Sequence, residues 1–306
     1  MSEDYSGFHG GNDDADSSGS ISHLIIYEAG YEVYSGIKLS GLALNSIGYG
    51  TSISNVAITN SAGNGITIDG GTVNACNLIL TDNEENSLEW DKGWNGNIQY
   101  ALMHPRHSEI GFSAIKGGST AENSLELDAL PISSPTISNI TLKGSTGEKG
   151  QLFNFETATQ GSLLNIVADG FQDCIQINGM RSSIRLENTL IECDAYDISL
   201  DDYNFAYVTS GVSMGDGITN EDVLISDNIA AASILGLDAS NLGNGYVDLG
   251  QAHEVASGNG IVLPNTPSSS NASIGFFHET DYLGAVSPNI TESTNTWFAW
   301  AQSYLP

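Results

Sequence analysis

The chain carries a repeat of about 22 residues, and this spacing limits how it can fold more than any other feature does. Polar residues, mostly asparagine, recur just before short stretches of alternating apolar side chains, a pattern typical of β-strands. These residues are Asn55, Asn77, Gln99, Asn139, Asn165 and Asn188, at steps of 22, 22, 40, 26 and 23 residues. The apolar pairs that follow them include Val56 and Ile58, Leu78 and Leu80, Tyr100 and Leu102, and Ile140 and Leu142.

A second column of strands keeps the same spacing. Its members are 66–69, 88–91, 113–116, 153–156, 175–178 and 198–201, and their last residues lie 22, 25, 40, 22 and 23 apart. Both columns lengthen to 40 in the same interval, which indicates stacked coils with one insertion at about 105–135. A single coil cannot bury its apolar residues alone and must pair with the coils on either side of it. The sequence therefore predicts a right-handed parallel β-helix, since parallel crossover connections are right-handed.

The rest of the chain is expected to be less regular. Residues 1–20 form an entry segment, expected to continue from coils that this chain does not include, and 21–203 form the coils. Residues 204–306 are rich in Gly, Asn and Ser and are expected to form irregular final coils and a C-terminal cap. The aromatic cluster from Trp297 to Trp300 is expected to cover the open end of the solenoid.

Charge limits the choice of partners. The chain has 8 Lys and Arg against 37 Asp and Glu, a formal net charge of −29. Such a surface repels nucleic acids and anionic membranes, and it disfavours a polyanionic substrate unless a cation intervenes. No apolar run is long enough to span a bilayer. We expect a secreted or surface protein in contact with divalent cations, whose export signal is not in this chain.

The repeated asparagines have a structural explanation. Asparagine tolerates the left-handed backbone of a tight turn, and stacked asparagines can bond to one another from coil to coil. We expect the column to hold turns rather than to bind ligands.

Several strands of the second column end in a carboxylate residue, and this acidic stripe suggests calcium. Asp69 and Asp91 would lie about 4.8 Å apart on adjacent coils and would repel each other unless a cation lay between them. Calcium fits because the ligands on offer are carboxylates and carbonyls. The candidate set is Asp69, Glu89 and Asp91, with Asp82 and Glu85 from the adjoining loop. The alternative is a solvated acidic face, and Lys116 is a salt-bridge partner for Asp91 or Glu156 in that stripe.

A second candidate calcium turn is Asp14–Gly19, which fits the first half of an EF-hand loop. Position twelve of such a loop is Ile25, so the bidentate glutamate is missing and an EF-hand is rejected. A looser calcium turn stays open.

Several stretches carry a family resemblance. They are 63–66, 70–74 and 82–96 in the coils, 12–19 and 27–30 at the start, and 280–285 near the end. With its Trp-Asp-x-Gly-Trp element at Trp90–Trp94, the chain resembles secreted or outer-membrane-associated bacterial β-helix proteins of the pectate-lyase-like superfamily, described as lipoproteins or surface-layer-like proteins. The pattern departs after Met103, where Glu109–Phe112 and Lys116 replace an acidic stretch. The resemblance implies a cell-surface β-helix and brings no catalytic residues.

Binding would use the outward strand positions and the Trp94 loop. We take Trp94, Glu89, Asn154 and Gln176 as candidate ligand-binding residues for a glycan or another cell-surface protein. Self-association through an exposed N-terminal coil is a further possibility, because uncovered strand edges can pair.

A polysaccharide lyase or hydrolase is the alternative function. Its base would be Lys116, or Arg106 with His104 and His107. Gln172–Cys174 is similar to a polygalacturonase strand, but glutamine replaces one carboxylate, so the acid and base pair is not assembled. No residue is therefore assigned as catalytic.

Overall fold

The computed structural model describes most of residues 9–200 and short later segments. The described ranges are 9–106, 111–119, 131–144, 150–156, 158–178, 182–200, 205–208, 212–214, 223–224, 246–247, 275–278, 280, 284–286 and 297–301. From residue 177 on, only part of the side chains is described.

Each coil contributes strands to two rows. Row A consists of β1 (Ser20–Tyr27), β5 (Ser52–Thr59), β7 (Asn74–Thr81), β9 (Asn97–His104), β11 (Thr136–Lys143) and the first parts of β13 (Gln160–Asn178) and β14 (Ser183–Leu200). Row B consists of β4 (Leu42–Ile47), β6 (Ile66–Gly71), β8 (Leu88–Asp91), β10 (Ser113–Gly117), β12 (Gln151–Glu156) and the last parts of β13 and β14. Within each row every strand pairs in parallel with its neighbours.

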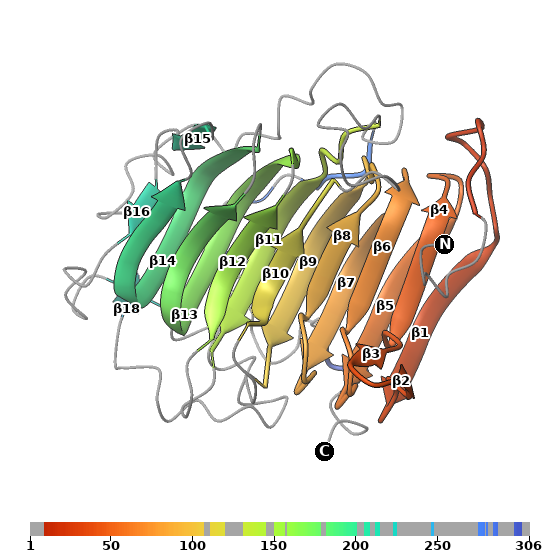
Figure 1. Ribbon diagram of the computed structural model, residues 1–306, viewed down its shortest axis with the longest axis horizontal. Helices are drawn as coiled ribbons and strands as arrows, with labels where there is room; N and C mark the ends of the chain where they lie inside the picture. Colours follow the sequence, from red (N-terminus) through yellow and green to blue (C-terminus); the bar gives the residue numbers. More distant parts are fainter. Residues whose placement is uncertain are drawn as a thin grey trace.

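The two rows form one curled sheet. Of its 14 strands, eleven follow the order β1-β5-β7-β9-β11-β13-β12-β10-β8-β6-β4, so that β13 joins the rows, and β14 pairs with β13 beside this path. Figure 1 shows the strands stacked side by side from the red end, at β1 and β4, to the green end at β14. The short strands β15 (Phe205–Val208) and β16 (Val212–Met214) extend the stack beyond β14. This is the predicted right-handed parallel β-helix.

The core lies between the rows because alternate side chains of each strand point inward. One buried cluster joins side chains of both rows. From row A it includes Val56, Ile58, Leu78 and Leu80, and from row B it includes Ile66, Ile68, Leu88 and Trp90. No single coil could enclose this cluster, so stacking provides most of the apolar burial.

The asparagine column is confirmed at four of its positions. Asn55, Asn77, Asn139 and Asn165 all have φ between 53° and 60°, the left-handed region that asparagine tolerates. Asn77 Nδ2 also donates to Asn55 Oδ1 at 3.3 Å, one coil away.

At the coil of Gln99 the position predicted from the repeat is wrong by one residue. Asn77 and Asn139 both face Tyr100, which has φ 63°, whereas Gln99 aligns with Cys76 and Ser138. Ala101 and Met103 therefore face the core, and Leu102 points outward. Gln99 carries a side-chain amide like that of asparagine. The sequence pattern therefore assigns it to the asparagine column, one residue before the true position at Tyr100.

The second column is confirmed at β6 and β8 and shifted at β10. Leu88 and Glu89 face Ile115 and Lys116, so Lys116 lies two positions from where the column places it. The cause is Gly117, which occupies the inward position beside Trp90. A Cβ on Gly117 would come within 2.3 Å of the Trp90 ring, so the indole fills the space of the missing side chain.

The first coil is longer than the next ones because a hairpin interrupts it. β2 (Glu32–Tyr34) and β3 (Ile37–Lys38) pair antiparallel between β1 and β4. A second antiparallel pair, β17 (Val223–Leu224) with β18 (Tyr246–Val247), lies later in the chain.

The C-terminal aromatic segment covers a side of the solenoid, not its end. Phe298 packs with the outward side chains Ala57, Ile79 and Leu102 of row A. Asn139 donates to Thr280 Oγ1 at 3.1 Å, which holds an earlier part of the same tail against the strands. The predicted end cap is therefore wrong in position, because outward apolar residues on row A offer this segment a lateral surface.

The extra residues of the long coil lie mainly between β10 and β11, within the interval 105–135. The domain boundaries proposed from the sequence remain predictions, since 204–306 are described only in short segments.

Candidate functional site

The outward face of row B carries an aligned set of polar side chains. In register across consecutive strands lie Thr67, Glu89, Lys116, Asn154 and Gln176. Lys116 thus belongs to the row of Glu89, in the centre of this face.

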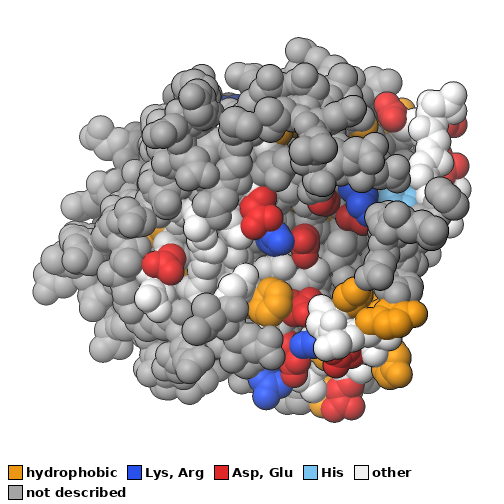
Figure 2. Space-filling model, in the orientation of Figure 1, with side chains coloured by type: hydrophobic (Ala, Val, Ile, Leu, Met, Phe, Trp, Pro, Cys, Tyr) orange, Lys and Arg blue, Asp and Glu red, His pale blue; other side chains and the backbone are white. Residues whose placement is uncertain are grey.

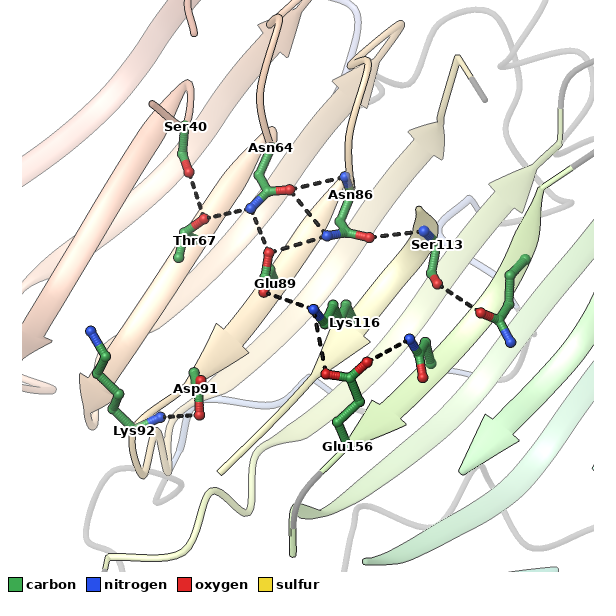
Figure 3. A network of polar contacts seen from close by, with 12 residues as sticks. Ser40, Asn64, Thr67, Asn86, Glu89, Asp91, Lys92, Ser113, Lys116 and Glu156 are labelled. Atoms are coloured by element: carbon green, nitrogen blue, oxygen red, sulfur yellow. Dashed lines mark hydrogen bonds and ion pairs between the residues drawn. The ribbon is translucent and has the colours of Figure 1, made fainter. Parts of the chain in front are cut away.

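Two asparagines from the preceding turns fix the Glu89 carboxylate. Glu89 Oε2 accepts from Asn64 Nδ2 at 2.6 Å and from Asn86 Nδ2 at 3.1 Å, and the two asparagines also bond to each other at 3.1 Å. Asn86 Oδ1 accepts in turn from the backbone N–H of Ser113 at 2.8 Å. Figure 3 shows this network running from coil to coil.

Lys116 bridges two carboxylates on the same face. Its Nζ lies 3.6 Å from Glu89 Oε1 and 3.4 Å from Glu156 Oε2. Burial favours a lower pKa for Lys116, but the two glutamates outweigh it and the pKa is raised. The raised pKa favours the ammonium form of Lys116 at neutral pH, which pairs with both carboxylates. The predicted pairing with Glu156 is confirmed, and Glu89 is its second partner.

The predicted calcium ligands lie in three separate environments. Asp69 and Asp91 are neighbours in register, as expected, and Lys92 Nζ lies 2.9 Å from Asp69 Oδ2. Glu89 faces Asn64, Asn86 and Lys116, as described above.

The loop residues of the calcium set lie at the other end of β8. Glu85 lies 3.9 Å from Lys38, and the backbone N–H of Asp82 donates to the carbonyl of His104 at 2.8 Å. Among the described residues no three His, Cys, Asp or Glu side chains are grouped to hold a metal ion. Calcium therefore stays a prediction, to be tested by titration.

The Asp14–Gly19 turn lies against the first coils through its backbone. The carbonyl of Asp14 accepts from Tyr49 N at 2.9 Å and from Thr72 Oγ1 at 2.7 Å. The side chains of Asp14 and Asp16 are exposed. Backbone hydrogen bonds therefore hold this segment on the first coils, and the looser calcium turn stays a prediction.

Trp94 is not a surface platform. It is fully buried, its ring lies 6.0 Å from that of Trp90, and Nε1 donates to the carbonyl of Val73 at 3.1 Å. Gly96 makes this possible, because a Cβ there would lie 2.5 Å from Trp94 Nε1. The ligand-binding prediction for the Trp94 side chain is therefore wrong.

The other predicted ligand-binding residues are engaged with neighbours. Asn154 is 7% exposed and donates to Glu156 Oε1 at 3.0 Å. Gln176 Oε1 accepts from Gln151 Nε2 at 2.9 Å and is half-buried. Both lie on the outward face, but Asn154 offers little surface to a ligand.

The alternative catalytic residues do not converge. His104 Nδ1 donates to the carbonyl of Lys143 at 2.8 Å, and Arg106 lies 3.4 Å from Asn60 Oδ1 and 3.9 Å from Glu84 Oε1. Lys116 instead contacts Glu89 and Glu156. His107 lies outside the described residues.

A groove that sequence reasoning missed lies beside the face. It crosses the turns that follow β4, β6, β8, β10 and β12, and the segment 10–16 forms one wall, with a volume of about 1210 Å³. We call it the turn-row groove. Hydroxyl and amide side chains line it, among them Ser46, Asn95, Ser134, Thr136 and Gln160.

Small residues open the turn-row groove. Glycines recur where row B strands end: Gly48 follows β4, Gly70 and Gly71 are the last residues of β6, and Gly93 lies two residues after β8. At Gly48 a Cβ would come within 2.6 Å of the Asp16 backbone, so glycine is needed for the wall to approach. This recurring glycine is the sequence signal that would have revealed the groove.

One comparison with known proteins supports the fold. No helix long and apolar enough to cross a bilayer occurs in the part of the chain that the structure describes. Comparison with curated proteins and with solved structures gives no match. A family model for the pectate-lyase-like β-helix domain matches residues 1–246, and with the two stacked rows of parallel strands it shows that the chain belongs to the pectate-lyase-like β-helix family.

Proposed function

We propose that this protein is an extracellular binding module that holds an extended, uncharged glycan in the turn-row groove. The observation that carries the proposal is the course of the groove across successive coils. Coils repeat about every 4.8 Å, so hydrogen-bonding groups recur regularly along the groove. A linear polymer with a regular repeat is the ligand that such a surface suits.

The chemistry of the lining supports a hydroxyl-rich ligand. Asn and Gln amides and Ser and Thr hydroxyls both donate and accept hydrogen bonds, as sugar hydroxyls do. The described lining residues include no aromatic ring, so affinity would come from hydrogen bonds rather than stacking.

Charge supports an uncharged glycan over a uronic acid polymer. Asp13, Asp14 and Asp16 line the groove, and its one lining cation among the described residues, Lys92, is paired with Asp69. The chain as a whole carries −29. An anionic polymer would meet repulsion at close range and at long range.

The Trp94 loop would give the groove a rigid floor. The indole is anchored in the core, Gly93 N donates to Ser133 Oγ at 2.9 Å, and Asn95 N donates to the carbonyl of Gly71 at 2.9 Å. These bonds hold Lys92 and Asn95 at the groove surface. Preformed sites lose less conformational entropy on binding than mobile ones do.

Affinity electrophoresis through gels that contain one polysaccharide each tests this function. We expect retardation in an uncharged glucan, xylan or galactan and none in polygalacturonate. Release of reducing ends or of unsaturated products from any of these polymers would instead favour the polysaccharide lyase or hydrolase. Migration unchanged in every gel would contradict the proposal.

Assembly through the first coil is a second candidate function. Ile21, Leu24 and Ile26 of β1 are only partly buried, whereas the residues that face them in β5 are 0–3% exposed. β1 and β4 are the ends of the strand order, so their outer edges lack a partner strand within this sheet. Sedimentation velocity over a range of protein concentrations tests this candidate: a concentration-dependent rise supports it, and one unchanging monomer contradicts it.

A further inference from the structure

A second hollow lies on the first coil, away from the turn-row groove. It is bounded by the hairpin β2–β3, by the turn between β7 and β8, and by Phe112 before β10, and its volume is about 1090 Å³. We call it the hairpin hollow. Figure 2 shows hydrophobic and acidic side chains gathered together at this end of the molecule.

Apolar exposure is concentrated there. Tyr31 is 77% exposed and Leu39 is 45% exposed, and both line the hollow. Tyr27 and Tyr34, at 50% and 58%, lie on the same stretch of chain. All large hydrophobic side chains that are exposed among the described residues thus fall within 27–39. Exposed large apolar side chains that are concentrated in one part of a protein are typical of an interaction surface.

Carboxylates surround the aromatic patch. Glu28, Glu32, Glu84 and Glu85 line the hollow, and Lys38 is the lining cation among the described residues. Lys38 lies 3.2 Å from Glu84 and 3.9 Å from Glu85, so its charge is shared between these two. The hollow therefore combines an excess of negative charge with a tyrosine face.

We propose that the hairpin hollow binds an arginine- or lysine-rich segment of a partner protein. A cationic side chain over a tyrosine ring and beside carboxylates gains from both groups, and its aliphatic stem covers the apolar surface. A second copy of this chain fits the hollow less well, because its 8 Lys and Arg against 37 Asp and Glu offer few cationic side chains for the carboxylates to bind. This inference is independent of glycan binding in the turn-row groove.

Two variants separate specific binding from general charge attraction. Tyr31→Ala removes the exposed ring. Glu32→Gln removes one charge but keeps the oxygen that accepts from Gly36 N at 2.8 Å. Asp173→Asn, on β13, makes the same change of charge several coils away and serves as the matched control.

The probe is a fluorescein-labelled peptide of alternating arginine and glycine, measured by anisotropy in 150 mM salt. We expect Tyr31→Ala and Glu32→Gln each to weaken binding about two- to fivefold, as expected for loss of one exposed cation–π or charge contact. Asp173→Asn should bind like the unmodified protein. Equal losses in Glu32→Gln and Asp173→Asn would show only non-specific attraction and would overturn the proposal. So would a concentration-dependent dimer that Tyr31→Ala dissociates, since the patch would then join two copies.

Discussion

Lys92 Nζ lies 2.9 Å from Asp69 Oδ2 on the adjacent coil, so an ammonium group occupies the neighbourhood where the acidic stripe requires a cation. Asp91 follows Asp69 in register and its carboxylate accepts from the backbone N–H of Lys92 at 2.7 Å. The side chain and the backbone of one residue therefore each contact one of these carboxylates.

Lys92→Met should make the protein respond more strongly to calcium. Without the ammonium, Asp69 and Asp91 face each other and repel, which we expect to cost about 1 kcal/mol of folding free energy. Calcium should restore more stability to this variant than to the unmodified protein. Melting temperatures with calcium and with chelator check this. A calcium shift that is equally large in both proteins would instead support a calcium site that does not depend on Lys92.

Asn86→Ala should destabilise the coil stack. The substitution removes the acceptor of Ser113 N and the donor to Glu89, at a residue that is 3% exposed. Loss of a buried hydrogen-bond partner costs about 1–3 kcal/mol. Urea denaturation measures the change, with the exposed Asn12→Ala as control. If the two variants lose equal stability, the network contributes nothing specific.

Trp94→Ala should act on stability, as expected of a core residue. Removing a buried tryptophan typically costs about 3–5 kcal/mol, and Trp94→Phe should cost less. Denaturant unfolding measures both variants. A loss below about 1 kcal/mol for Trp94→Ala would mean that the ring is not packed in the core.

Lys116→Met should change how stability varies with alkaline pH. Because the folded pKa of Lys116 is raised above its usual 10.5, its charge stabilises the fold fully below pH 10.5, and this contribution is lost as pH rises through the folded pKa. The unmodified protein should therefore lose more stability above pH 10.5 than Lys116→Met does. Parallel stability curves for the two proteins in that range would refute the bridge between Glu89 and Glu156.

The sequence predicts the fold because the repeat is a local pattern that stacking copies from coil to coil. At Asn55 and Asn77 the left-handed backbone follows from the preference of asparagine itself, so a single residue type in the sequence is enough to predict it. The register of a strand is harder to predict where one side chain fills space that its neighbour leaves empty. Gly117 makes room for the Trp90 ring, and a search for repeated apolar residues misses this position because glycine has no side chain.

The site is less predictable because it depends on contacts between distant segments. Trp94 lies in a polar, glycine-rich loop that resembles an exposed one, yet Gly96 lets its ring turn into the core. The wall of the turn-row groove comes from 10–16 and its floor from turns as far away as Gln160. Sequence spacing does not bring these residues together.

Calorimetry with an uncharged polysaccharide, on Gln160→Ala and Gln172→Ala, tests glycan binding most directly. Both glutamines are exposed, and of the two it is Gln160 that lines the turn-row groove. We predict that the polysaccharide retarded in gels binds the Gln172→Ala variant like the unmodified protein and binds Gln160→Ala more weakly. Equal affinities for both variants, or no binding of any uncharged polysaccharide, would contradict the account.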